Sequence, residues 1–165
     1  PIPFMVSSKN RLRFMAFGLM FVTLFFSLLY LGRKKQTLQS AQIELKIQLT
    51  EQKIELALSE SDFARALSNL LDNAIDAVRG RANPSIQIST KLDGHRASLI
   101  ILDNGKGMTP DFTKRLGKPG LTSRPDGNGL GVYWVKKWAK SQNIDIKFES
   151  EKGVGTIVAL FLVAV

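Results

Sequence analysis

The stretch LDNGKGM, at residues 102–108, places an acid and two glycines directly after an apolar run. An ionised Asp103 only accepts hydrogen bonds, so it suits a donor such as the exocyclic amine of adenine. Gly105 and Gly107 carry no Cβ and let the backbone approach a flat base or a phosphate. The same residues also make ordinary turns, so a plain turn after a strand is the alternative interpretation.

A second glycine cluster, GNGLGV at residues 127–132, stands directly before a predicted helix. Glycines that open a helix expose unpaired N–H groups and the positive end of the helix dipole, which together attract an anion. A P-loop is excluded because no GxxxxGK followed by Ser or Thr occurs in the sequence. A flexible entry into the helix is the alternative here.

The third candidate is a pair of amides, Asn69 and Asn73, one turn apart on a helix predicted over residues 63–78. Amide oxygens can complete an octahedral Mg²⁺ shell that is shared with phosphates and water. The helix is expected to be capped by Ser61 and Asp62, with one apolar face in the core. Its opposite face is unusually rich in amides and acids: Asn69, Asp72, Asn73 and Asp76.

Alternation of apolar and polar residues predicts the strands that must position these candidates. The clearest case is IELKIQL at residues 43–49, although apolar residues there could also share one stripe of a helix. The other predicted strands lie at residues 54–58, 85–92, 96–102, 144–150 and 154–162. Two more helices are predicted, at residues 111–116 and 130–141. This order predicts an α/β sandwich (α+β), a mixed β-sheet with helices packed on one face.

The formal net charge of +9 is concentrated near the N-terminus. Six basic residues flank an apolar run and no acid precedes Glu44, so residues 36–165 hold 17 basic and 14 acidic residues. This balance argues against a nucleic-acid partner. The sequence has no cysteine, which excludes disulfides and thiolate chemistry.

The apolar run FMAFGLMFVTLFFSLLYL, at residues 14–31, predicts one transmembrane helix. A signal peptide fits less well, because basic residues follow the run and it has no small-residue cleavage pattern. The expected organisation is a basic flank, a membrane span, a linker and one globular domain, at residues 1–13, 14–31, 32–41 and 42–165.

Taken in order, the motifs resemble those of the GHKL ATPase superfamily, which includes gyrase, the large heat-shock chaperone, histidine kinases and MutL. LSNLLDNAIDAV looks like the N-box of that family, DNGKGM and GNGLGV its two glycine boxes, and GVGT a shorter terminal glycine motif. The resemblance covers about residues 42–165. It implies the Bergerat fold, with ATP and Mg²⁺ between the N-box helix and a mobile lid at about residues 105–128.

Carried over residue by residue, the resemblance implies that Asn73 holds Mg²⁺ and that Asp103 accepts a hydrogen bond from adenine. Thr156 would support the base pocket. The other implied nucleotide-binding residues belong to the two glycine boxes: Gly105, Gly107, Met108, Gly129, Leu130 and Gly131. The glycines of the first box would shape the adenine pocket, and those of the second would approach the phosphates.

Asn69 separates the branches of this superfamily. Gyrase-like and MutL-like members and the anti-sigma kinases carry a catalytic Glu there, whereas an amide cannot abstract a proton. Asn69 therefore fits the histidine-kinase branch, which transfers the phosphoryl group to another acceptor, and it is also a candidate Mg²⁺ ligand. Positive charge near the γ-phosphate would come from lid residues, for which the candidates are Lys106, Lys118 and Arg124.

A histidine kinase also needs a phosphoacceptor His on a dimerising helical hairpin. The single histidine, His95, lies in a predicted turn between two strands, without the residues of an H-box around it. The segment between Leu31 and the first predicted strand is too short for such a hairpin. The acceptor His is therefore expected in a separate protein or in missing sequence.

The leading hypothesis is the ATP·Mg²⁺-binding catalytic domain of a membrane-bound sensor histidine kinase, an incomplete part of a two-component system with a response regulator as partner. One alternative is a GHKL-type protein kinase that acts in trans on a separate partner. The other is a non-catalytic, membrane-tethered nucleotide-binding module. With ATP as ligand, the globular domain is expected on the cytoplasmic side of the inner or plasma membrane.

Overall fold

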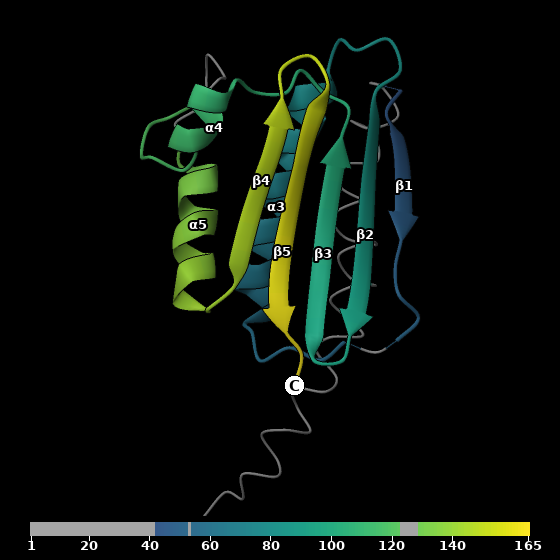
Figure 1. Cartoon of the computed structure of the whole chain (residues 1–165), viewed down its shortest axis with the longest axis vertical. Coiled ribbons are helices and arrows are strands. Elements are labelled where there is room, and N and C mark those ends of the chain that lie inside the picture. Colours follow the sequence, from purple (N-terminus) through teal and green to yellow (C-terminus); the bar gives the residue numbers. More distant parts are fainter. Residues whose placement is uncertain (1–41, 53, 123–128) are drawn as a thin grey trace, which may run out of the picture.

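The computed structural model describes residues 42–52, 54–122 and 129–165, which build a five-stranded mixed sheet with helices against one face (Figure 1). The strand order is β1-β2-β3-β5-β4; β1 is parallel to β2, and the other neighbours are antiparallel. The strands are β1 Glu44–Gln48, β2 Ser85–Asp93, β3 Arg96–Asp103, β4 Asp145–Glu151 and β5 Gly155–Val163. The helices are α3 Glu60–Val78, α4 Pro110–Arg115 and α5 Gly131–Ser141. The predicted mixed α/β fold is confirmed.

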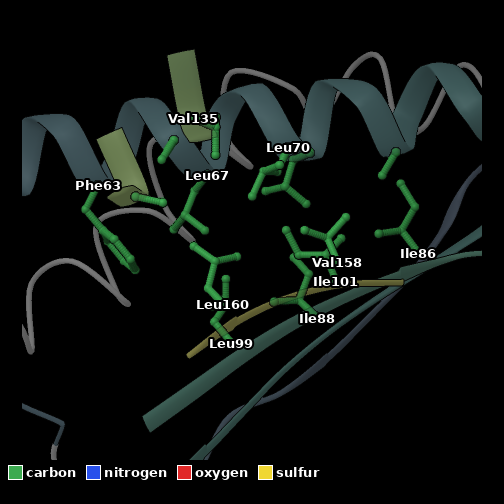
Figure 2. Packing of buried hydrophobic residues seen from close by; sticks show 14 of the residues in the cluster. Phe63, Leu67, Leu70, Ile86, Ile88, Leu99, Ile101, Val135, Val158 and Leu160 are labelled. Carbon is green, nitrogen blue, oxygen red and sulfur yellow. The ribbon is translucent and has the colours of Figure 1, made fainter. Parts of the chain in front are cut away.

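The long helix α3 lies across the sheet and supplies one side of the core (Figure 2). Its apolar residues recur every three or four positions, so Leu67, Leu70 and Ala74 share its buried face. The sheet presents Ile86, Ile101 and other alternate residues of β2, β3 and β5 toward it. The residues of α3 that face away from this core are left to form a site.

The N-terminus of α3 lies earlier than the sequence analysis predicted. Ser59 is the cap, and its Oγ accepts a hydrogen bond from the Asp62 backbone N–H at 3.4 Å. Ser61 and Asp62, the predicted caps, are already inside the first turn. Glu60 and Asp62 place two acids there, where they stabilise the positive end of the helix dipole.

The strand predicted at residues 54–58 is wrong. This segment is irregular, although Ile54, Leu56 and Leu58 pack against the core as the alternation requires. The Glu55 carbonyl accepts a hydrogen bond from the Val165 backbone N–H at 2.9 Å, and no strand ladder forms there. The alternating apolar side chains of this segment therefore pack on the core from a loop, and the segment does not pair with a neighbouring strand.

One corner of the sheet joins β1, the segment before β2 and the end of β3. The Glu44 N–H donates to the Pro84 carbonyl at 2.8 Å, next to Ser85. The Asn104 side chain accepts from the Ser85 N–H at 2.8 Å and donates to the Asn83 carbonyl at 2.6 Å. These bonds hold the exit of β3 in place.

Several predictions fall on residues that the structure does not describe. They are the basic flank at residues 1–13, the transmembrane helix at 14–31, the linker at 32–41, Arg124 and part of the lid, at residues 123–128. Among the helices of residues 42–52, 54–122 and 129–165, none has both the length and the apolar character that a membrane crossing requires.

Two valines on β5 test the assignment of the core face. Val158 is 7% exposed and Val163 is 70% exposed. We expect Val158→Ala to lower the free energy of unfolding by roughly 2 kcal/mol, because it removes two buried methyl groups and leaves a void. The matched Val163→Ala change should alter it by less than about 0.5 kcal/mol. Urea unfolding of both variants measures the difference, and equal losses would contradict the assignment.

Candidate nucleotide-binding site

Asp103 is the last residue of β3, and its side chain is buried at the end of the sheet. It pairs with Ile86 of β2 and with Thr156 of β5, and only 5% of the residue is exposed. Its carboxylate accepts hydrogen bonds from the backbone N–H of Gly105, at 2.8 Å, and from that of Thr156. The predicted loop position is therefore wrong by one residue, because the ladder with β5 extends through Asp103.

Burial raises the pKa of Asp103 to about 6, since desolvation of the carboxylate outweighs the two backbone hydrogen bonds that lower it. The folded pKa lies above the unfolded one, so this group stabilises the fold at low pH. That contribution is lost as the pH rises toward 6, and ionisation then costs on the order of 3 kcal/mol. Above about pH 6 the fold therefore carries a buried, ionised acceptor at a cost in stability.

A cavity of about 230 Å³ lies beside Asp103, between α3, the sheet and the glycine-rich segments. Ile101, Val158 and Phe148 contribute apolar wall from the sheet, and Phe112 contributes some from α4. The polar face of α3 forms the opposite wall with four side chains: Asn69, Asp72, Asn73 and Asp76. One end of the cavity is thus suited to a flat, largely apolar group, and one wall is rich in oxygen ligands.

The first glycine box is fixed between α3 and the β4–β5 hairpin. A Cβ on Gly105 would lie 2.5 Å from the carbonyl carbon of Ala77, and the Lys106 N–H donates to the Ala77 carbonyl at 2.9 Å. The Lys106 carbonyl accepts from the Gly153 N–H at 2.8 Å. Gly107 has a φ of +58° and passes the Glu151 carbonyl too closely for a side chain. Gly105 therefore allows the loop to pack closely against α3. Of the two glycines in this box, Gly107 is the one that lines the cavity.

The second glycine box brings the start of α5 to the polar face of α3. Gly129 has a φ of +66°, and a Cβ there would lie 2.5 Å from the backbone of Gly120. A Cβ on Gly131, the first residue of α5, would lie 2.9 Å from Asn69 Oδ1. The N-cap residue, Leu130, makes no side-chain cap hydrogen bond. Through Gly129 and Gly131 this helix start lies at the cavity, where backbone N–H groups and the helix dipole could attract an anion.

Lys136 of α5 fixes the segment after α4, a contact that the sequence did not predict. Its Nζ donates to the Leu116 carbonyl at 2.7 Å and lies 5.3 Å from the centre of the Phe148 ring. Its side chain also occupies the space that a Cβ on Gly117 would need. Burial lowers the pKa of Lys136. Leu116, which lines the cavity, is thereby held against α5.

Most of the residues predicted for the site meet at this one cavity. Those that line it are Asn69, Asn73, Asp103, Lys106, Gly107, Met108, Gly129, Gly131 and Thr156. Gly105, Leu130 and Lys118 are not among its lining residues, and Arg124 lies outside the described residues. Several lining residues belong to no motif and were not predicted from the sequence: Phe112, Leu116, Leu121 and Phe148.

The residues present fit both ATP and Mg²⁺. Asp103 is a buried acceptor at the apolar end, and the start of α5 offers N–H groups to phosphates at the polar end. Asn73 lies in the wall of the same cavity, where its amide could share a Mg²⁺ ion with phosphate oxygens. Bound Mg²⁺ would supply neutralisation of phosphate charge.

Comparisons with known proteins agree with this geometry. Residues 58–164 match the family model described as histidine kinase-, DNA gyrase B-, and HSP90-like ATPase. Sporulation kinase E of Bacillus subtilis (strain 168) is 29% identical over 122 residues, which cover 74% of this chain and 16% of that protein. The sensor histidine kinase ZraS of Salmonella typhimurium is 30% identical over 128 residues, covering 77% of this chain and 27% of that protein. The chain thus spans only a minor part of these relatives.

Solved structures show the same fold. The mycobacterial sensor histidine kinase MprB superposes with a TM-score of 0.67 at 22% identity, covering 79% of this chain and 88% of that structure. The catalytic domain of histidine kinase ThkA gives a TM-score of 0.71 at 16% identity, covering 81% and 87%. The chain therefore belongs to the histidine kinase-, DNA gyrase B- and HSP90-like ATPase family, and its described part is an ATP-binding catalytic domain of histidine-kinase type.

Proposed function

We propose that this chain binds ATP·Mg²⁺ and transfers the γ-phosphoryl group to a histidine on another domain or protein, within a membrane-bound two-component system. The observation that carries the proposal is the meeting of Asp103, Asn73 and the start of α5 at one cavity. In this proposal the carboxylate accepts from adenine, the amide holds Mg²⁺ and the helix start contacts phosphates.

The character of Asn69 supports transfer over hydrolysis. Its Nδ2 donates to the Arg65 carbonyl of its own helix at 2.9 Å. Its Oδ1 therefore lies next to Gly131, at the start of α5. An amide in this place can contact a ligand but cannot take a proton from water. Transfer of the phosphoryl group is therefore favoured to an acceptor that supplies its own nucleophile.

The position of His95 supports an acceptor outside the described residues. His95 is exposed in the turn between β2 and β3, and Asp103 lies at the other end of β3. Eight strand residues span on the order of 25 Å, so His95 cannot reach the cavity of its own domain. A phosphoacceptor His in a separate domain, with a response regulator downstream, is the corresponding proposal.

Membrane attachment is part of the same proposal and is supported by the sequence alone. The apolar run at residues 14–31 is long enough to span a bilayer, and basic residues flank it on both sides. Because ATP is a cytosolic nucleotide, we propose that residues 42–165 face the cytoplasm.

The adenine contact is tested with Asp103→Asn. We expect ATP affinity to fall roughly 100-fold, because a charged acceptor is lost from a buried site. The melting temperature at pH 7.5 should not fall, since the ionised carboxylate destabilises the free fold. Asp93→Asn, at the exposed end of β2, is the matched control. Calorimetric titration of the full chain in detergent gives the affinities, and unchanged ATP binding in Asp103→Asn would refute the contact.

The pH dependence of binding gives a second test. Because the pKa of Asp103 is raised to about 6, we expect ATP affinity to be constant above pH 7 and to fall below pH 6, by up to about tenfold per pH unit. The amine of adenine needs the ionised carboxylate, which protonation removes. Excess Mg²⁺ keeps the nucleotide phosphates ionised during the titration. A constant affinity down to pH 5 would rule out Asp103 as the titrating acceptor.

Phosphoryl transfer is tested with ATP that is radiolabelled at its γ-phosphate. The full chain, Mg²⁺ and a separately produced phosphoacceptor domain should give acid-labile label on the acceptor. Asn73→Ala should still bind ATP without Mg²⁺, yet lose the Mg²⁺-dependent gain in affinity and the transfer. Label on Ser, Thr or Tyr of a partner would favour a protein kinase of another type. Binding without transfer to any acceptor would favour a non-catalytic module.

A further inference from the structure

Ser150, the next-to-last residue of β4, lies behind the cavity and joins three separate segments. Its Oγ donates a hydrogen bond to the Gly155 carbonyl at 2.9 Å and accepts one from the Met108 N–H at 2.9 Å. It also lies 2.9 Å from Thr156 Oγ1. Thr156 and Met108 line the cavity, and Ser150 is not among the described residues that do. Ser150 lines a second hollow together with Asp103 and Thr156. At the first cavity it acts on a ligand through its neighbours.

Counting hydrogens fixes the direction of the contact between the two hydroxyls. A serine hydroxyl has one hydrogen and two lone pairs. The Gly155 carbonyl can only accept, so it takes the hydrogen of Ser150. Thr156 must then donate to Ser150, and with the Met108 N–H this fills both lone pairs of Ser150 Oγ. The hydroxyl hydrogen of Thr156 therefore points to Ser150 and away from the cavity.

Thr156 consequently presents only lone pairs toward the ligand. Its neighbour across the ladder is Asp103, and side chains of directly paired residues lie on the same face of a sheet. An ionised carboxylate also presents only acceptors. Both residues are less than a tenth exposed. At this end of the cavity the two side chains, Asp103 and Thr156, therefore both present acceptors to a ligand.

We propose that Ser150 is a positioning residue that makes this site select a 6-aminopurine over a 6-oxopurine, by holding the Thr156 hydroxyl as an acceptor. The inference rests on the proposed binding of ATP and adds a residue that does not touch it. An amino group at position 6 donates to both acceptors. A 6-oxo group would place its lone pairs against theirs, and a buried, unpaired set of acceptors is strongly unfavourable.

The test compares ATP with inosine triphosphate, in which the 6-amino group is replaced by an oxo group. Affinities for both are measured by calorimetry on the full chain in detergent, with Mg²⁺ present. In Ser150→Ala the Thr156 hydroxyl is free to rotate and donate to the 6-oxo oxygen. We expect the ratio of ATP affinity to inosine triphosphate affinity to fall roughly tenfold relative to the unaltered chain.

Three further variants separate this role from a structural one. Ser150→Thr keeps the hydroxyl and should restore the ratio, and Ser98→Ala, on β3 away from the cavity, should leave it unchanged. Thr156→Val removes the rotating hydroxyl and should also lower the ratio. Adding Ser150→Ala to Thr156→Val should then change it no further, because the two hydroxyls act as one unit.

The outcomes distinguish this inference from the proposed function. If the unaltered chain binds neither nucleotide, the proposed function fails. If it prefers ATP and Ser150→Ala lowers both affinities by the same factor, the role of Ser150 in selection is refuted while ATP binding stands. Should Ser150→Ala fail to fold, as its melting temperature would show, Thr156→Val decides: an unchanged ratio overturns the inference.

Discussion

The burial of one carboxylate at the end of β3 sets the geometry of this domain. Asp103 occupies a ladder position between β2 and β5, and two backbone N–H groups are turned toward it. One of them, from Gly105, belongs to the chain just beyond the strand, so the carboxylate also determines how that chain turns. The turn then runs against α3 through the bond from Lys106 to Ala77. The base end of the site and the packing of the helix are thus held together.

Around the cavity, the two glycine boxes approach three other segments more closely than side chains allow. Gly107 passes the Glu151 carbonyl, Gly129 passes Gly120, and Gly131 meets the Asn69 side chain. Each contact joins a glycine box to a different segment: the β4–β5 hairpin, the segment after α4 and the long helix. The glycine boxes therefore act first as close-packing devices, and the ligand groups are exposed as a result of that packing.

Much of this arrangement could be predicted from the sequence, because long periodic segments carry their own signal. The helix with Asn69 and Asn73, the β2–β3 hairpin and the terminal hairpin were predicted close to their observed positions. Irregular packing was not: the alternation at residues 54–58 has the pattern of a strand but belongs to a loop. Local pattern does not show whether a partner strand is available.

The network around Ser150 could not be predicted for a related reason. Met108 and Ser150 are separated by 42 positions, and their hydrogen bond depends on the fold that brings β4 beside the first glycine box. A serine near the end of a strand has no distinctive spacing. The same holds for Lys136, whose contact with the Leu116 carbonyl joins residues 20 apart. Motifs identified many of the residues that line the cavity, whereas the residues that hold them in place depend on long-range contacts.

The corner where β1 enters the sheet gives the site an asymmetric mechanical connection. A force on the chain at Glu44 acts first on its hydrogen bond to the Pro84 carbonyl. Asn83 and Ser85, on either side of Pro84, are hydrogen-bonded to Asn104, the neighbour of Asp103. A load applied there reaches the base end of the cavity through a few hydrogen bonds. Within the sheet, β2, β3 and β5 lie between this edge and β4. The chain that enters the sheet at Glu44 is thus connected to the neighbour of Asp103 through a few hydrogen bonds, and it lies at the edge of the sheet opposite β4.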